Sequence, residues 1–200
     1  MPKSQQRQYR AFSPLGITAE QKRLDSNFYT EGYATTWQRY VLYEDLEGPV
    51  YEQFTKDAFI GTDMADVIMQ YDHQGRVFAR ISNKTLIVEP DDNGLFVAAD
   101  LSKSENAKGL YEEISNGLIT KMSWGFAPGE YYFDKASRTI IHTKVKKIYD
   151  VSAVSIPAND TTDIHARSFV DGEINKMMQE LQERKNAELR LRLKLKLGGI

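Results

Sequence analysis

The chain has 200 residues, of which 41% are hydrophobic and 27% are charged, and its formal net charge is −2. These values are typical of a soluble globular protein, so they exclude extensive disorder, and the absence of long apolar runs excludes a membrane-spanning helix. The chain contains no cysteine, which excludes disulfides, thiolate metal sites and thiol nucleophiles.

The first 27 residues are polar and basic and show no hydrophobic periodicity. They predict a flexible arm over residues 1–27 without a secretory signal, and therefore an intracellular protein. From Phe28 to about Phe169, short runs rich in β-branched and aromatic residues alternate with turn signals and predict strands. The predicted strands lie within Phe28–Thr36, Tyr40–Tyr43, Val77–Val88, Leu95–Leu101, Ile119–Ala127, Tyr131–Phe133 and Thr139–Ile156.

Two segments of this body have helical character. Asp63–Gln70 is short and amphipathic, whereas Ser104–Asn116 has a serine suited to the N-cap, apolar residues at helical spacing and Gly117 as a stop. Glu89–Gly94 has the composition of a tight hairpin loop. The sequence therefore predicts a mainly β protein, an antiparallel barrel or sandwich, with peripheral helices.

Beyond the predicted body, 28–171, the composition changes. Residues 172–200 predict an amphipathic, basic, helical C-terminal tail, with Ile174–Leu189 as its helix. Both ends of the chain are basic and the middle is acidic, which argues against specific nucleic-acid binding as the main function.

Few residues have the setting of a catalytic group. His73 lies in a polar turn, a common place for catalytic side chains, whereas His142 lies within a predicted strand with either face possible. Ser123 lies in an apolar, β-like run, where its hydroxyl must bond the backbone or serve chemistry. Phosphate-loop, zinc-helix and dinucleotide motifs are absent, so the sequence predicts neither a cofactor nor a metal.

Six segments of the chain form one ordered pattern, which consists of Glu31–Ala34, Glu52–Phe59, Tyr71–His73, the hairpin Arg80–Leu86 with Asp91–Leu95, Gly117–Phe126 and Asp150–Asn159. Taken in this order, they resemble the prohead (capsid maturation) proteases of tailed bacteriophages, serine peptidases related in fold to the herpesvirus assemblins. Lys56-Asp57 stands where the family has Pro-Gly. The resemblance implies an antiparallel barrel of the assemblin type.

The resemblance also implies a Ser–His–acid peptidase. Ser123 is then the nucleophile and His73 the general base, and the third member is Asp150, where the family usually has glutamate. Assemblins use a second histidine in that role, which leaves His142 as the alternative, although a carboxylate supplies more charge stabilisation. The oxyanion-hole candidates are the backbone around Arg80 and the loop after Phe126.

The function implied is a phage maturation protease in the host cytoplasm, inside the procapsid. Its substrates would be the major capsid protein, scaffold segments and itself by autocleavage, and a homodimer is possible; no membrane partner is expected. Two alternatives remain, which are a non-catalytic capsid assembly or scaffolding module and a hydrolase of small esters that uses the same residues.

Overall fold

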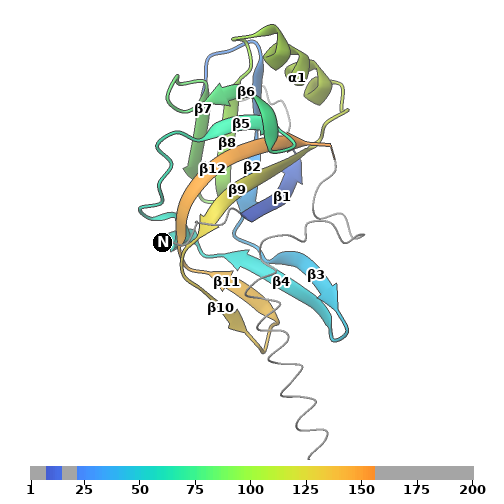
Figure 1. The fold of residues 1–200 in the computed structure, drawn as a ribbon, viewed down its shortest axis with the longest axis vertical. Helices are drawn as coiled ribbons and strands as arrows, with labels where there is room; N and C mark the ends of the chain where they lie inside the picture. Colours follow the sequence, from blue (N-terminus) through green and yellow to red (C-terminus); the bar gives the residue numbers. More distant parts are fainter. Residues whose placement is uncertain (1–7, 15–21, 156–200) are drawn as a thin grey trace, which may run out of the picture. The chain divides into compact units, whose positions relative to one another are not determined.

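A computed structural model of the chain describes residues 8–14 and 22–155, which form a mainly β structure with one α-helix (Figure 1). The strands are β1 (Gln8–Pro14), β2 (Tyr29–Thr36), β3 (Tyr40–Asp45), β4 (Gly48–Phe54), β5 (Ile68–Tyr71), β6 (Gln74–Arg80), β7 (Leu86–Pro90), β8 (Gly94–Asp100), β9 (Lys121–Pro128), β10 (Tyr131–Asp134), β11 (Thr139–His142) and β12 (Val145–Val154). The helix α1 spans Glu105–Ser115, and a 3-10 turn, η1, spans Lys56–Phe59.

The strands form three sheets, with the orders β1-β9-β12-β5-β6, β10-β11-β4-β3 and β2-β8-β7. Most neighbours are antiparallel, but β12 pairs with β5, and β11 with β4, in parallel. The mainly β prediction is thus confirmed, whereas the described strands do not close into the predicted barrel. Closure needs a continuous hydrogen-bonded circuit. Here β1 lies beside β2, and β6 beside β7, without a ladder that joins the sheets.

The core lies between the sheets and is rich in aromatic side chains. Trp124 and Phe126 of β9 stack with ring centroids 4.3 Å apart, and Phe54 of β4 packs edge-on against both. Because side chains alternate along a strand, Ser123 and Gly125 lie on the opposite face of β9 from these rings. The core thereby fixes the orientation of the candidate nucleophile.

Of the two predicted helices, only the second is confirmed. In α1, the amide of Ala107 donates to the Ser104 hydroxyl, and Gly117 has a φ of 71° at the stop. The prediction for Asp63–Gln70 is wrong, because β5 begins within this stretch at Ile68 and no helix forms there. Val67 and Met69 are both fully buried, so two-residue alternation and pairing with β12 and β6 prevail over the weak helical pattern.

The predicted arm, 1–27, and the predicted tail, 172–200, are only partly or not at all within the described residues. The predicted tail, 172–200, lies outside the described residues, and the boundaries of the arm and the body stay predictions. Strand β1 lies within the stretch expected to be a flexible arm. In the described ranges, no helix is long and apolar enough to cross a membrane.

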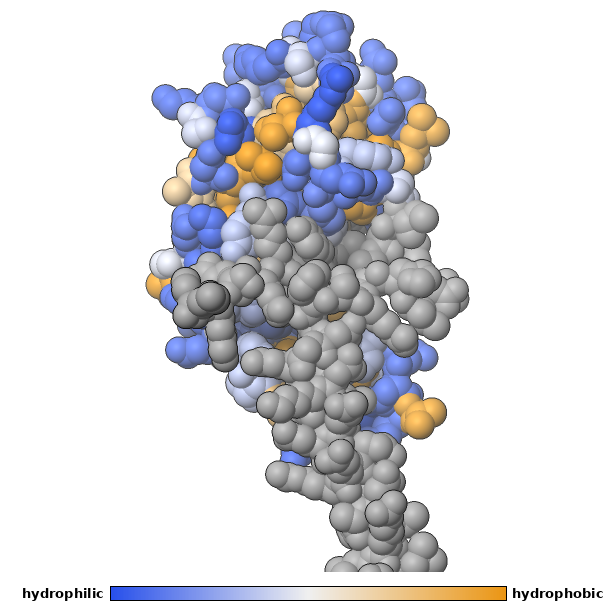
Figure 2. Space-filling model, viewed as in Figure 1, coloured by the Kyte–Doolittle hydropathy of each residue, from blue (hydrophilic) through white to orange (hydrophobic). Residues whose placement is uncertain are grey.

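Some large apolar side chains remain exposed. They are Leu46, Ile60, Val77, Leu118, Tyr131 and Tyr132. Apart from Tyr131 and Tyr132, which are adjacent in β10, they come from separate loops and strands. On the face drawn in Figure 2, hydrophobic residues lie among hydrophilic ones. Apolar residues scattered in this way are ordinary on a protein surface and do not by themselves indicate a docking face.

Candidate active site

The turn between β5 and β6 holds a strained histidine. Tyr71 pairs with Gln74, so the turn consists of Asp72 and His73, and both have positive φ, 46° and 58°. Two such residues are the signature of a type I′ hairpin turn, which normally selects Asn or Gly. A histidine in this conformation costs about 1 kcal/mol or more, so surrounding contacts must hold it there.

Strand β12 and the residue after it supply those contacts. The Asp72 amide donates to the Ala153 carbonyl at 3.0 Å, and the His73 amide donates to the Ser152 hydroxyl at 3.2 Å. The Asp72 carboxylate in turn accepts from the amide and the hydroxyl of Ser155, at 3.0 and 2.9 Å. The turn is therefore fixed to β12 through backbone and side chain together.

Three side chains from this sheet form one hydrogen-bonded chain. His73 Nε2 lies 2.6 Å from Ser123 Oγ, and His73 Nδ1 lies 2.5 Å from Asp150 Oδ1. The topology explains the meeting, because β12 pairs with β9 on one side and with β5 on the other. The carboxylate and the hydroxyl thus come from neighbouring strands, and the imidazole comes from the turn that follows β5.

A fourth polar side chain, Ser152, supports this arrangement. Its hydroxyl donates to Asp150 Oδ1 at 3.1 Å and accepts from the backbone of His73. The Asp150 side chain is 2% exposed and that of His73 is 17% exposed, so the imidazole lies between a buried carboxylate and the surface. The sequence reasoning missed Ser152, although its position two residues after Asp150 places both on one strand face.

His142, the alternative third member, lies in another sheet with a carboxylate of its own. Its Nε2 is 2.8 Å from Glu52 Oε1, and Glu52 also accepts a hydrogen bond from the Tyr40 hydroxyl. The ring of His142 stacks on Phe54, with centroids 4.6 Å apart. The structure therefore brings His73, Ser123 and Asp150 together and pairs His142 with Glu52, a residue that no sequence pattern singled out by itself.

At both predicted sources of oxyanion-hole donors, backbone amides already have hydrogen-bond partners within the fold. The Arg80 amide donates to the Thr85 hydroxyl at 2.9 Å, while the Arg80 side chain forms an ion pair with Asp66. The residues after Phe126 continue β9 as far as Pro128, and the next amide, that of Gly129, donates to the Lys144 carbonyl. These N–H groups are occupied in the fold, so they are not free to bind an oxyanion.

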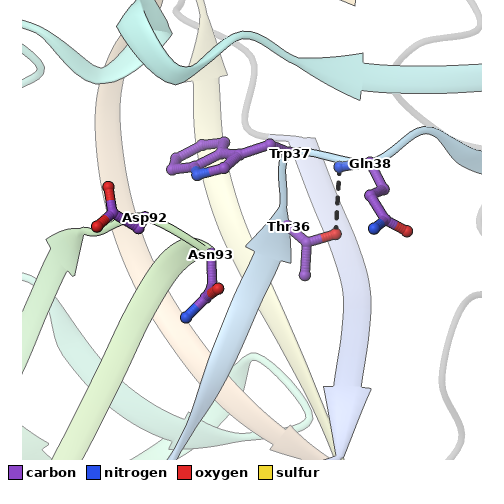
Figure 3. Close-up of a pocket in the computed structure, with 5 residues that line it drawn as sticks. All are labelled: Thr36, Trp37, Gln38, Asp92 and Asn93. Carbon is purple, nitrogen blue, oxygen red and sulfur yellow. Dashed lines mark hydrogen bonds between the residues drawn. The ribbon is translucent and has the colours of Figure 1, made fainter.

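A surface pocket of about 420 Å³ lies where the loop after β2 meets the turn between β7 and β8 (Figure 3). It is lined by Thr36, Trp37, Gln38, Asp92 and Asn93. The Trp37 indole donates to the Asp91 carbonyl at 3.1 Å, which joins the loop to the hairpin. None of the three hydrogen-bonded side chains lines this pocket, so it is separate from the candidate site.

The site has the geometry of a serine hydrolase, in which an imidazole contacts a hydroxyl through one nitrogen and a carboxylate through the other. Among the described residues, no group of three or more His, Asp or Glu side chains is placed to hold a metal ion.

Comparison with known families makes the assignment specific. A family model described as caudovirus prohead serine protease matches residues 17–179, well over half of the chain, and the chain therefore belongs to that family. It is accordingly a serine endopeptidase of phage prohead maturation, a protease that acts on capsid proteins within the procapsid. Searches of curated proteins and of solved structures give no match.

Proposed function

We propose that His73, Ser123 and Asp150 are the catalytic triad of this prohead protease. The observation that carries the proposal is the continuous chain of hydrogen bonds from Ser123 Oγ through the imidazole to Asp150, at 2.6 and 2.5 Å. Its members lie on three different elements and are separated by 50 and 77 residues in the sequence. Such a convergence of a nucleophile, a base and an orienting carboxylate is how triads are recognised across unrelated folds.

In this mechanism, Ser123 Oγ attacks the scissile carbonyl carbon while His73 Nε2 takes the hydroxyl proton. The Asp150 carboxylate holds the imidazole through Nδ1–H and stabilises the imidazolium that forms. His73 then gives the proton to the leaving amine, and a water molecule, deprotonated by the same nitrogen, hydrolyses the acyl-enzyme. The aspartate stands where the resembling proteases usually have glutamate, and the 2.5 Å contact supports the view that the shorter side chain still reaches the imidazole.

The substrates in this proposal are flexible, extended segments of the major capsid protein and of the scaffold inside the procapsid, together with the protease itself. A protease needs an extended backbone at its nucleophile, which exposed chain ends provide more readily than packed elements. Membership of the prohead protease family supports capsid substrates. Scaffold cleavage, autocleavage and dimerisation are the finer parts of the proposal.

Intact mass spectrometry tests the proposal directly. Wild type, Ser123→Ala and the matched control Ser115→Ala, which removes an exposed helix hydroxyl, are incubated alone and with the cognate capsid or scaffold protein. Fragments are expected with wild type and Ser115→Ala and not with Ser123→Ala. Cleavage that survives Ser123→Ala would contradict the assignment of the nucleophile.

A fluorophosphonate probe tests the same site without any protein substrate, because it phosphonylates activated serines. We expect one adduct on wild type, located at Ser123 by peptide mapping, and none on Ser123→Ala or His73→Ala. An unlabelled wild type that also cuts no capsid protein would favour the non-catalytic assembly module. Labelling at Ser123 with turnover of chromogenic esters but no cleavage of capsid or scaffold would favour the ester hydrolase.

A further inference from the structure

The N-terminal strand β1 lies directly beside the strand that carries Ser123. β1 pairs antiparallel with β9 on the side away from β12, and the two are neighbours in Figure 1. In this register, Ala11 lies opposite Ser123 and Gln8 lies opposite Phe126. The backbone of residues 8–14 therefore passes alongside the proposed nucleophile, along what we call the β9 edge, the backbone of Lys121–Pro128 that faces away from β12.

β1 is not part of the stretch that defines the family. The family match begins at residue 17, after β1 ends, whereas β5, β6, β9 and β12 all lie within it. Without β1, this sheet would end at β9. An edge strand offers a row of unpaired N–H and C=O groups, which readily accept an extended peptide as an additional strand.

The position of β1 fits an occupant of the substrate site. The ladder is regular from Gln8 to Phe12 and becomes irregular between Phe12 and Pro14, directly beyond the residue opposite Ser123. Ser123 itself is only 3% exposed. A substrate that bound as a strand along the β9 edge would need the place that β1 holds.

We propose that residues 8–14 occupy the substrate-binding edge of this protease as an internal competitor, and that the extended segment of a capsid substrate binds by displacing them. The proposal rests on Ser123 as the nucleophile. If β1 fills the edge about 90% of the time, the apparent affinity for substrate is lowered about tenfold. The rate of cleavage then stays low until the local concentration of substrate segments is high enough to displace β1.

Two prolines in β1 test this competition in the full chain. Adjacent residues of an antiparallel ladder alternate between facing the partner and facing away, so Arg10→Pro with Ala11→Pro removes one donor to β9 whichever residue faces it. The matched control is Ser4→Pro with Gln5→Pro, ahead of β1. All variants carry Ser123→Ala, so the measurement is binding alone.

The probe is a fluorescein-labelled peptide with the sequence of residues 6–16, followed by fluorescence anisotropy. We expect the Arg10→Pro/Ala11→Pro variant to bind it about tenfold more tightly than the Ser123→Ala parent, with the control equal to the parent. Equal affinity for all three proteins, or binding to none, overturns the proposal.

A second measurement needs no change in β1, and so stands even if the double-proline variant fails to fold. The Ser123→Ala protein is saturated with a heavy-isotope form of the same peptide, and amide hydrogen exchange is read by mass spectrometry. Protection of the protein's own residues 8–14 should fall while that of β9 persists. Unchanged protection of 8–14 when the peptide is bound refutes displacement.

The two proposals fail separately. Because neither binding experiment depends on turnover, a negative result here beside Ser123-dependent cleavage of capsid protein would remove the competitor and leave the triad standing. A positive result beside cleavage that survives Ser123→Ala would leave peptide binding at the β9 edge and remove the nucleophile.

Discussion

Two histidine–carboxylate pairs in this molecule have different surroundings. His73 contacts Asp150 through one nitrogen and a hydroxyl through the other, in a turn where its side chain is 17% exposed. His142 contacts Glu52 through Nε2, and its Nδ1 is buried without a hydrogen bond among the described residues. Its ring stacks on Phe54 and its side chain is 3% exposed.

The contrast shows that a histidine beside a carboxylate is not by itself an active site. General-base chemistry needs the second imidazole nitrogen on a nucleophile that a substrate can approach. His142 stands in a ladder, on β11 beside β4, and its second nitrogen faces the interior. His73 stands in a strained turn fixed to β12. The His142–Glu52 pair is placed to support the fold, whereas the His73–Asp150 pair has the geometry that the proposed general base needs.

The largest effect is expected from Ser123→Ala or His73→Ala, each of which lowers kcat by a factor of about 10⁴ or more, with a nearly unchanged melting temperature. Because the residues act as a unit, the double variant should be no slower than either single one. Single-turnover cleavage of capsid protein measures the rates. Multiplying effects in the double variant would indicate independent roles.

Asp150→Asn sharpens the comparison between the two pairs. Loss of the carboxylate charge removes imidazolium stabilisation, and kcat should fall by about 10⁴, whereas His142→Ala should leave kcat within about twofold in the folded protein. Steady-state kinetics on one peptide substrate checks both. The reverse pattern would assign the third role to His142.

Substitution of the histidine should also affect stability differently in the two pairs, with little change for His73→Ala and a clear loss for His142→Ala. His142→Ala removes one hydrogen-bond donor from Glu52, which is fully buried, and should lower the free energy of unfolding by about 1–3 kcal/mol in denaturant titrations. Adding Glu52→Leu to His142→Ala should recover a large part of that loss, because the buried carboxylate that lost its histidine donor is gone. No recovery would locate the cost in the lost ring packing instead.

Most strands were predicted from runs of β-branched and aromatic residues, but β1, β4 and β5 were missed. β5 has four residues, too few to establish a period, and its apolar residues also suit a helical turn. β4 was covered by no predicted strand. β1 lies in a polar, basic stretch that ends at a proline, so its pairing with β9 depends on a partner more than a hundred residues away.

For the candidate site, local sequence patterns predict less than the family resemblance does. Composition alone singled out His73 and Ser123 weakly, and the resemblance supplied Asp150 and their roles. The Glu52–His142 pair was not predictable, because it depends on the parallel pairing of β4 with β11 across 90 residues. Strand order, which no local motif encodes, decides which carboxylate each histidine meets.

The smallest effect on kcat is expected from the serine hydroxyls that hold the His73–Asp150 pair in place. Ser152→Ala removes a hydrogen bond to Asp150 and the acceptor for the His73 amide, and should lower kcat about tenfold with KM unchanged, since hydrogen bonds to charged groups contribute about 1.5–3 kcal/mol. Ser152→Thr keeps the hydroxyl and should restore most of the rate. Ser155→Ala keeps the hydrogen bond from the Ser155 amide to Asp72 and loses only the one from the hydroxyl. It should therefore lower kcat by less than Ser152→Ala does. A Ser152→Ala variant with a lower melting temperature but an unchanged kcat would show that this serine supports the fold and does not position the imidazole.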